Sequence, residues 1–247
     1  EVSCLVQAGA HPNVIGLRAL FPLPGTDDVR DIAIVLDYAA GGDLFNYCVQ
    51  RGTCTEELAA YMLRGLLLAL AHVHSHNVIH RDVKPENLLV AGDGRPVLAD
   101  FGIAARLAKG QKLSERVGSL GYAAPEVIMG HKYSFEIDTF GAGGVLHFMI
   151  AGTPPYTGKD KNKVMWKTCQ GHLNLKRSPW NQTSGGCKEI LQHLLAPQCK
   201  DRPSAHAAMR HSWLNIERDA TLLGKGGELL KVCSLWRWID AVFGPKA

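Results

Sequence analysis

One apolar helical run constrains the fold of this chain more than any other feature. Residues 53–77, TCTEELAAYMLRGLLLALAHVHSHN, start with Thr53 and Glu56 at capping-box spacing, and large apolar residues then recur every four positions at 58, 62, 66 and 70. This pattern predicts a long, deeply packed helix. Such a helix needs a sizeable core around it, which a chain of 247 residues can supply.

The segments on either side of this run differ in kind and predict an α+β fold. Residues 1–9 predict a short helix with Val2, Leu5 and Val6 on one face, and residues 13–21 and 31–38 predict the two strands of a hairpin. Later helical patterns alternate with loops at residues 134–152, 161–171, 186–196 and 205–214, and a last apolar helix is predicted at 227–243. The sequence thus predicts a small piece with a helix and two strands, followed by a larger helical piece.

The amino-acid composition limits the classes of binding partner that can be expected. The 27 Lys and Arg residues against 23 Asp and Glu give a net charge of +4, which is too small and too dispersed for a nucleic-acid binder. The longest apolar helix candidate, residues 140–152, is too short to span a bilayer, so no membrane partner is expected. Seven scattered cysteines without a C-x-x-C pair favour a reducing compartment. A soluble protein partner is the remaining expectation.

The polar loop after the long helix carries the candidate chemistry. In VIHRDVKPENLLV, residues 78–90, Asp82, Lys84 and Asn87 lie within six residues, and Asp100 follows thirteen residues after Asn87. Asparagine and aspartate offer oxygen ligands, which Mg²⁺ prefers and which it uses together with substrate phosphates. Asp82 is then free to accept a proton. The nearby histidines at 72, 74, 76 and 80 do not predict a zinc site, because no cysteine or carboxylate completes a tetrahedron.

This loop resembles the signature of protein kinases, H-R-D-x-K-x-x-N followed by D-F-G. Further segments similar to motifs of that family occur in the family's order: LDYAAGGDLF, GSLGYAAPE, DTFGAGGV and DRPSAHAAMRHSWL. The resemblance covers residues 1–214, and Lys84 together with Ser119 matches serine/threonine kinases. The segments SPWNQTSGGCKEILQHLL and RHSWL are most similar to the calcium/calmodulin-dependent and calcium-dependent kinases.

The resemblance implies a two-lobe kinase fold with a truncated N-terminal lobe. Residues 1–36 would be what remains of that lobe, 37–42 the hinge, 43–214 the C-terminal lobe and 215–247 a tail. Glu1 matches the helix glutamate that pairs with a strand lysine, so the chain is expected to start inside a longer protein and to lack that lysine and the glycine-rich loop. The chain by itself is therefore expected to be weakly active or inactive.

The resemblance also implies a role for each candidate residue. Asp82 would be the catalytic base, Lys84 would steady the transferring phosphoryl group, and Ser119 would lie close to both. Asn87 and Asp100 would hold Mg²⁺ on the phosphates of ATP. The ATP site would further include Glu1, Leu36 as gatekeeper, Asp37, Tyr38 and Ala39 at the hinge, Asp43 and Glu86 near the ribose, and Leu89 under the adenine. Glu126 and Arg202 would form a buried ion pair.

The loop between Asp100 and Ser119 leaves two interpretations of Glu115 open. Many relatives in the family are phosphorylated four residues before the position of Ser119, where this chain has Glu115. The single negative charge of Glu115 would be a weak built-in substitute for a phosphate, and Arg81 would bind an acidic group on this loop. The alternative is a solvated loop glutamate.

Two functions fit these observations. The first is a serine/threonine protein kinase, of which this chain is a part, that transfers the γ-phosphate of ATP to protein substrates; the second is a truncated kinase-like binding module without catalysis. Residues 227–243 lie where such kinases often carry an autoinhibitory or calmodulin-binding helix. Their charges nearly cancel, which favours packing on the larger lobe or an unrelated tail over calmodulin binding. Calcium control would then lie outside the chain, and the expected location is the cytoplasm, with the nucleus as the alternative.

Overall fold

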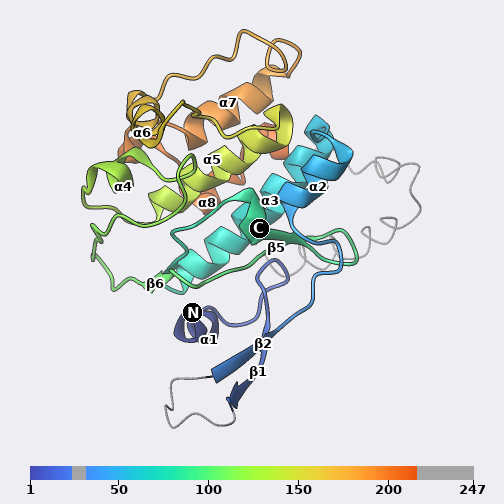
Figure 1. Cartoon of the computed structure of the whole chain (residues 1–247), viewed down its shortest axis with the longest axis vertical. Coiled ribbons are helices and arrows are strands. Elements are labelled where there is room, and N and C mark those ends of the chain that lie inside the picture. Colours follow the sequence, from blue (N-terminus) through green and yellow to red (C-terminus); the bar gives the residue numbers. More distant parts are fainter. Residues whose placement is uncertain (24–31, 216–247) are drawn as a thin grey trace, which may run out of the picture.

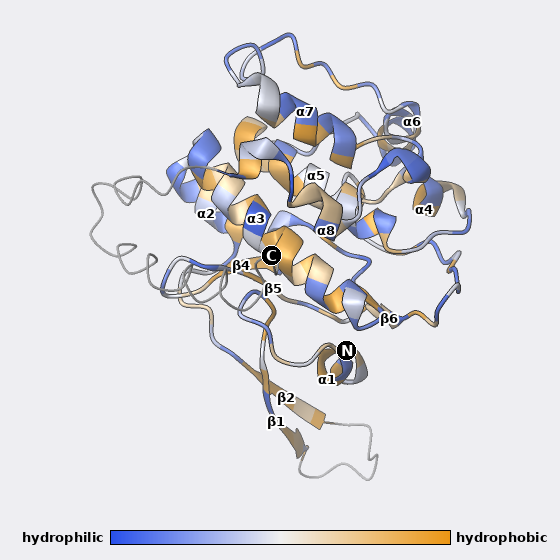
Figure 2. Cartoon of the chain, turned by 180° about the vertical axis from the view of Figure 1, so that it is seen from behind, coloured by the Kyte–Doolittle hydropathy of each residue, from blue (hydrophilic) through white to orange (hydrophobic). Residues whose placement is uncertain are grey.

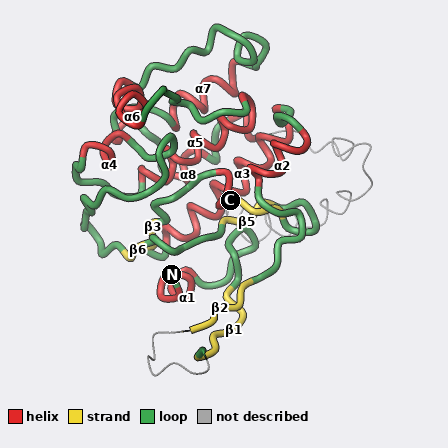
Figure 3. The backbone as a smooth tube through the Cα atoms, in the orientation of Figure 1, coloured by secondary structure: helices red, strands yellow, loops and turns green. Residues whose placement is uncertain are grey.

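The computed structural model describes residues 1–23 and 32–215, so most of the predicted hairpin loop and the predicted helix at 227–243 lie outside the described residues. Figure 1 shows most helices gathered in one body, with α1 and a two-stranded hairpin at one end. Figure 3 shows the loops that connect them. In chain order the elements are α1 Val2–Ala8, β1 Leu17–Pro22, β2 Ile32–Leu36, α2 Leu44–Arg51, α3 Glu56–Ser75, β3 Val78–Ile79, a 3-10 turn Pro85–Asn87, β4 Leu88–Val90, β5 Pro96–Leu98, β6 Ala105–Arg106, α4 Pro125–Met129, α5 Glu136–Ala151, α6 Lys161–Gln170, α7 Gly185–Leu194, a 3-10 turn Cys199–Asp201, α8 Ala205–Ala208 and a 3-10 turn Ser212–Leu214.

Helix α3 lies at the centre of the helical body. By length and composition it could cross a membrane, and it is this helix, not residues 140–152, that is the longest apolar one in the described chain. In the fold its apolar side chains pack against α5, α8 and β5. The buried face is wider than a repeat of four residues predicts and includes the fully buried Leu63, Leu66, Leu67 and Leu70. Burial of one such leucine stabilises the fold by about 1.5–3 kcal/mol.

The start of α3 differs from its prediction. The N-cap is Thr55, whose Oγ1 accepts a hydrogen bond from Leu58 N at 3.3 Å. The predicted cap at Thr53 is wrong, because Cys54 N donates to Met149 O at 2.7 Å and holds this part of the chain against the end of α5. An N-cap must directly precede the first helical residue, and the capping threonine here is two residues later than the capping-box spacing predicts.

Helix α5 is buried on all sides. Every residue from Ile137 to Ile150 is buried, which is typical of a helix in the middle of a core. Close packing explains why residue 141 is a glycine. A Cβ atom at this position would lie 2.7 Å from the Cβ of Val83 and 2.8 Å from its carbonyl oxygen. The missing side chain lets α5 lie directly against the loop that carries the candidate chemistry.

The predicted hairpin is confirmed, but its first strand begins later than predicted and its second strand ends at Leu36 and not at residue 38. β1 and β2 pair antiparallel. Residues 13–15 belong to neither strand and contact the helical body instead: Ile15 N donates to Leu98 O at 2.9 Å, and Leu98 N donates to Asn13 O at 2.8 Å. The Asn13 side chain also donates to Pro96 O at 2.7 Å. These long-range hydrogen bonds with β5 explain why the strand begins later.

The predicted first helix, α1, is also confirmed, with a different buried face. Its buried residues are Cys4, Leu5 and Ala8, whereas Val6 is 65% exposed. The buried face is determined by the contact with α3, because His72 Nε2 of α3 donates a hydrogen bond to Ala8 O at 2.7 Å. Helix α1 therefore packs on the C-terminal end of α3.

A buried ion pair joins α4 to the segment before α8. Nη1 and Nη2 of Arg202 each lie 2.6 Å from one carboxylate oxygen of Glu126. The guanidinium also donates to the carbonyls of Ala196 at 2.7 Å and Pro197 at 3.1 Å, and it lies 4.9 Å from the ring centroid of Phe140. The contact that the resemblance implied is confirmed.

Replacing Arg202 by alanine should lower the free energy of unfolding by about 3–5 kcal/mol, because Glu126 is left buried without its cation. Urea unfolding followed by circular dichroism measures the change. Arg210→Ala is the matched control, since Arg210 is exposed and its loss should change stability by no more than about 0.5 kcal/mol. Equal effects of the two substitutions would contradict the structural role of the pair.

Candidate active site

A short antiparallel strand pair brings two candidate residues together. β4 directly follows Asn87, and β5 ends two residues before Asp100, with Leu88 opposite Leu98. Ala99 N donates to Asn87 O at 2.9 Å. Because antiparallel pairing sets the start of one strand beside the end of the other, Asn87 and Asp100 lie at the same end of this pair.

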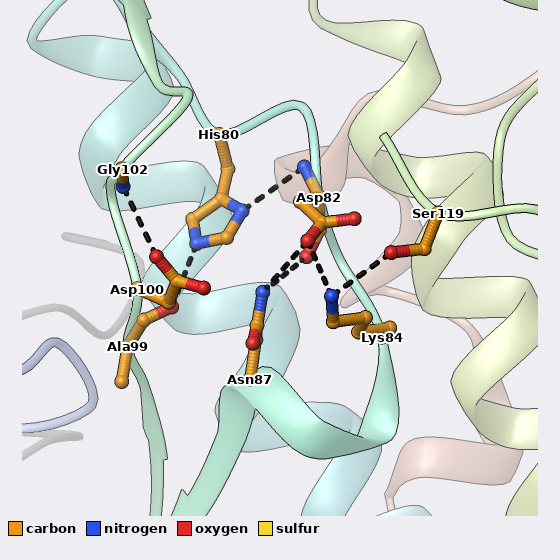
Figure 4. Close-up of polar contacts among 8 residues, drawn as sticks. All are labelled: His80, Asp82, Lys84, Asn87, Ala99, Asp100, Gly102 and Ser119. Atoms are coloured by element: carbon orange, nitrogen blue, oxygen red, sulfur yellow. Dashed lines mark hydrogen bonds and ion pairs between the residues drawn. The ribbon is translucent and has the colours of Figure 1, made fainter. Parts of the chain in front are cut away.

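Figure 4 shows the side chains that meet at Asp82. Lys84 Nζ donates to Asp82 Oδ2 at 2.6 Å and to Ser119 Oγ at 2.9 Å. Asn87 Nδ2 donates to the same Oδ2 at 3.2 Å and to the main-chain oxygen of Asp82 at 2.9 Å. The three loop residues predicted from their spacing therefore form one cluster with Ser119, which we call the Asp82 group.

The other carboxylate oxygen of Asp82 has a different environment. Oδ1 is buried and has no hydrogen-bond partner among the described residues. Asp82 and Ser119 line a small cavity together with Arg81 and Tyr122. A buried acceptor without a partner destabilises a fold by about 1–3 kcal/mol. Oδ1 therefore keeps the capacity to accept a hydrogen bond from a hydroxyl group.

Asn87 and Asp100 can offer oxygen atoms to a cation. The nitrogen of the Asn87 amide is used on Asp82, so its oxygen is the atom left for a ligand. Asp100 is exposed, and its Oδ1 accepts a hydrogen bond from Gly102 N at 3.2 Å. Its backbone φ of 60° lies in the left-handed region, which is enriched at functional sites. An amide oxygen and a carboxylate fit Mg²⁺, a hard cation that takes oxygen ligands.

Asp138 of helix α5 fixes the backbone of this loop. The residue is 1% exposed, and its carboxylate accepts hydrogen bonds of 2.8 Å from His80 N, Arg81 N and His74 Nε2. Burial alone would raise the pKa of this carboxyl, but the hydrogen bonds from the His74 side chain and the His80 amide outweigh it and hold the pKa of Asp138 below its usual value. Arg81 has a φ of 71°, so the carboxylate stabilises a turn that a non-glycine residue rarely adopts.

The His80 ring connects the end of β5 with Asp82. Its Nε2 donates to Ala99 O at 2.9 Å, and its Nδ1 accepts a hydrogen bond from Asp82 N at 3.3 Å. One donor and one acceptor correspond to a neutral imidazole with its proton on Nε2. His80 is fully buried, so it holds Asp82 and the segment before Asp100 in fixed relation.

Arg81 pairs with the loop that follows Asp100. Its Nη1 forms an ion pair with the Glu115 carboxylate, and its Nε donates to Ile103 O at 2.6 Å. Tyr133 Oη donates to the main-chain oxygen of Glu115 at 3.0 Å. The structure thus confirms that Glu115 contacts Arg81, as the first of the two interpretations requires. The Glu115 side chain is nevertheless 62% exposed.

Two of the predicted nucleotide-binding residues lie side by side. Asp43 and Leu89 form an antiparallel bridge, next to which Gly41 N donates to Val90 O at 2.9 Å. The Asp43 carboxylate caps α2, accepting hydrogen bonds from Asn46 N at 2.8 Å and Asn46 Nδ2 at 2.7 Å. A contact of Asp43 with a ribose would have to share this carboxylate with the cap, and it stays a prediction.

The structure limits which backbone group of Asp37 is available at the predicted hinge. Asp37 N donates to Gly16 O at 2.9 Å and the carboxylate pairs with Arg18, so the carbonyl is the backbone group that Asp37 can still offer to an adenine. Tyr38 is 90% exposed. The roles of Leu36, Tyr38, Ala39, Glu86 and Leu89 stay predictions.

Glu1 is the predicted site residue at the start of the chain. It is exposed at the start of α1 and makes no capping hydrogen bond to that helix. Within the described residues, no hydrogen bond or ion pair joins its side chain to the Asp82 group. Its role at an ATP site stays a prediction.

One other cluster in the described part of the chain has side chains of the kind that bind metals. The ligand atoms of Glu189, His193 and His211 lie within 4.8 Å of one another. Nδ1 of His211 accepts a hydrogen bond from Trp213 N at 3.2 Å, which places the ring proton on Nε2, the atom 3.5 Å from Glu189. A protonated nitrogen cannot bind a metal, so this geometry does not favour a metal site.

Asp138 belongs to the DTFGAGGV segment that resembles a motif of the family, but the sequence alone predicted no positioning role for it or for His74. A signal for Asp138 was present, because it stands in the first turn of a helix whose later residues are mostly apolar, and a buried carboxylate needs hydrogen-bond donors. His74 gave no such signal, since a histidine near a helix end is ordinarily solvated. Their pairing spans 64 residues and depends on the packing of α3 against α5.

Comparison with known proteins gives a consistent set of relatives. Residues 1–214 match the protein kinase domain. The chain is 34% identical over 223 residues to Calcium-dependent protein kinase 25 of Oryza sativa subsp. japonica, covering 89% of this chain and 40% of the relative. It is 31% identical over 229 residues to Calcium-dependent protein kinase 14 of Arabidopsis thaliana, covering 92% and 42%. It is 32% identical over 222 residues to Serine/threonine-protein kinase PEPKR2 of Arabidopsis thaliana, covering 90% and 46%. The chain thus spans less than half the length of these relatives.

Asp138→Asn should remove one source of acid sensitivity. Because the folded pKa of Asp138 lies below the unfolded value, its carboxylate stabilises the fold fully above about pH 4, and this contribution is lost as the pH falls further. Urea unfolding at several pH values should show the variant less stable than wild type at pH 7, with the difference shrinking below about pH 4. A difference that is constant with pH would contradict the role of the ionised carboxylate.

Proposed function

The chain belongs to the protein kinase domain family, and on that premise we propose that its protein transfers the γ-phosphoryl group of ATP to serine and threonine hydroxyls of protein substrates. The observation that carries this proposal is the environment of Asp82. One oxygen is held by Lys84 and Asn87, and the other is a buried acceptor without a partner among the described residues, beside Ser119. This is the arrangement that a base for a substrate hydroxyl needs.

The proposed reaction follows from these positions. The substrate hydroxyl donates to Asp82 Oδ1, and its oxygen attacks the γ-phosphorus of ATP. As the new oxygen–phosphorus bond forms, the bond from the γ-phosphorus to the oxygen bridging it to the β-phosphate breaks, and ADP leaves with that oxygen. The hydroxyl proton passes to the Asp82 carboxylate.

The remaining residues of the site act on charge and position. The ammonium of Lys84, 2.9 Å from Ser119 Oγ, lies where it can attract the transferring phosphoryl group. The Asn87 amide oxygen and the Asp100 carboxylate would hold Mg²⁺. Bound there, the ion would offset negative charge on the phosphates. The contact between Lys84 and the Ser119 hydroxyl supports serine/threonine rather than tyrosine substrates.

Calcium control is a further part of the proposal. Two of the relatives named above are called calcium-dependent protein kinases. No D-x-D-x-D-G calcium loop occurs in the sequence. We propose that calcium acts on this kinase through a calcium-binding segment or protein other than residues 1–214.

Asp82→Asn should lower kcat by about a hundredfold to ten-thousandfold, because an amide cannot accept the hydroxyl proton. The assay measures incorporation of labelled γ-phosphate into protein substrates, with the protein produced from its whole coding sequence. The melting temperature should stay close to that of wild type, because asparagine keeps the shape of the side chain. Unchanged activity in a folded variant would overturn Asp82 as the base.

Glu115→Ala should reduce kinase activity by about threefold to tenfold, since Arg81 loses a charged hydrogen-bond partner. Glu115→Asp is the matched control that keeps the charge. Phosphatase treatment of the wild-type protein should leave most of the activity, because the carboxylate is permanent. Full activity of Glu115→Ala together with loss of activity after phosphatase treatment would show that a phosphate on another residue is the switch.

A further inference from the structure

Helix α6 carries a local excess of positive charge, in contrast to the dispersed charge expected from composition. Residues 159–167 contain four lysines and one acidic residue, a local net charge of +3 in a chain whose total is +4. Lys159, Lys161 and Lys163 are exposed, and Lys167 is half-buried with its Nζ donating to Thr157 O at 2.6 Å. Figure 2 shows that α6 is largely hydrophilic.

The acidic residue in this segment has its own hydrogen bond at the start of the helix. The Asp160 carboxylate caps α6, where its oxygen accepts a hydrogen bond from Lys163 N at 2.8 Å. A carboxylate at this position interacts with the positive end of the helix dipole. The exposed lysines are therefore left to interact with an external anion.

An exposed tryptophan lies among these lysines. Trp166 is 54% exposed, and Lys163 Nζ lies 4.1 Å from the centroid of its ring. A large aromatic side chain at the surface can bury much area on binding, and tryptophan is enriched among residues that dominate binding energy. We call the exposed side chains of Lys159, Lys161, Lys163 and Trp166 the α6 surface.

The α6 surface is connected to the candidate active site through α4. Helix α4 packs against α6, and Figure 1 shows the two helices at the same side of the body. Helix α4 begins six residues after Ser119, and its last residue, Met129, is 42% exposed. A protein that presents a hydroxyl at Asp82 can thus reach α6 along one side of the molecule.

We propose that the α6 surface binds an acidic segment of the protein substrate, at a distance from the hydroxyl that is phosphorylated. The inference rests on the proposed function in taking a protein substrate as the partner. Carboxylates of this segment would pair with the ammonium groups of Lys161 and Lys163, and one apolar side chain would cover the indole of Trp166. Such charge complementarity raises the association rate and selects among partners.

Other polyanions fit the α6 surface less well. A nucleic acid is typically bound by an extended run of basic side chains along its phosphates, whereas the α6 surface offers three lysines. Three exposed lysines and one tryptophan also form a small contact for an anionic membrane, which typically requires clusters of about four to eight basic residues.

The test uses a fluorescent peptide of repeated Glu-Glu-Leu units and a matched peptide of Gln-Gln-Leu units, with fluorescence anisotropy as the readout on the complete protein. The Glu peptide should bind, and its affinity should fall with added salt because the charges are exposed. The K161E/K163E variant should raise the Kd of the Glu peptide by at least about tenfold, and W166A by about fivefold to thirtyfold. The control variant K109E/K200E makes the same change of charge at two other exposed lysines. Its Kd for the Glu peptide should stay within about twofold of the wild-type value.

Four results would overturn the proposal: equal binding of both peptides, wild-type affinity of both α6 variants, tighter binding of phosphatidylcholine/phosphatidylserine vesicles, or tighter binding of a single-stranded oligonucleotide. Melting curves check that each variant is folded.

A kinase readout separates this inference from the proposed function. With a substrate that carries the Glu-Glu-Leu segment, the K161E/K163E variant should raise KM and leave kcat unchanged. Binding of the Glu peptide by a protein without kinase activity would contradict the proposed function alone. Activity with an unchanged KM in that variant would contradict the docking role alone.

Discussion

The buried carboxylate of Asp138 is the interaction on which the candidate active site depends. It projects from the first turn of α5, a helix in which every residue from Ile137 to Ile150 is buried, and accepts hydrogen bonds of 2.8 Å from the backbone amides of His80 and Arg81. Those two amides fix the turn that directs Asp82. Gly141, three residues further along α5, leaves room for Val83 in the same loop. One helix therefore forms the middle of the core and also sets the direction of the proposed base.

From this anchor the polar contacts lead to each part of the site. His80 connects Asp82 to the end of β5 and so to Asp100, while Arg81 reaches Glu115 on the following loop. The β4–β5 pair then sets Asn87 beside the same end. One hydrogen-bonded network thus holds the proposed proton acceptor, the proposed cation ligands and the contact between Arg81 and Glu115. Its buried side-chain polar groups have hydrogen-bond partners, apart from Oδ1 of Asp82, which the proposed reaction uses.

Sequence reasoning was most accurate where the signal was local. The helix α3, the hairpin and the cluster of Asp82, Lys84 and Asn87 follow from short spacings, and the α+β kinase fold that the motifs implied is confirmed by the match over residues 1–214. Long-range packing accounts for the errors and omissions. The pairing of residues 13–15 with β5 and the contact between His74 and Asp138 each depend on elements far apart in sequence. The concentration of charge at α6 was hidden in a total net charge that averages over the chain.

Phosphoamino acid analysis tests the central claim most directly. The protein from its whole coding sequence would be incubated with protein substrates, Mg²⁺ and ATP labelled at the γ-phosphate, and the labelled substrates would be hydrolysed to amino acids. We expect label on phosphoserine and phosphothreonine. Label on phosphotyrosine, or no label from a folded protein that binds ATP, would contradict it.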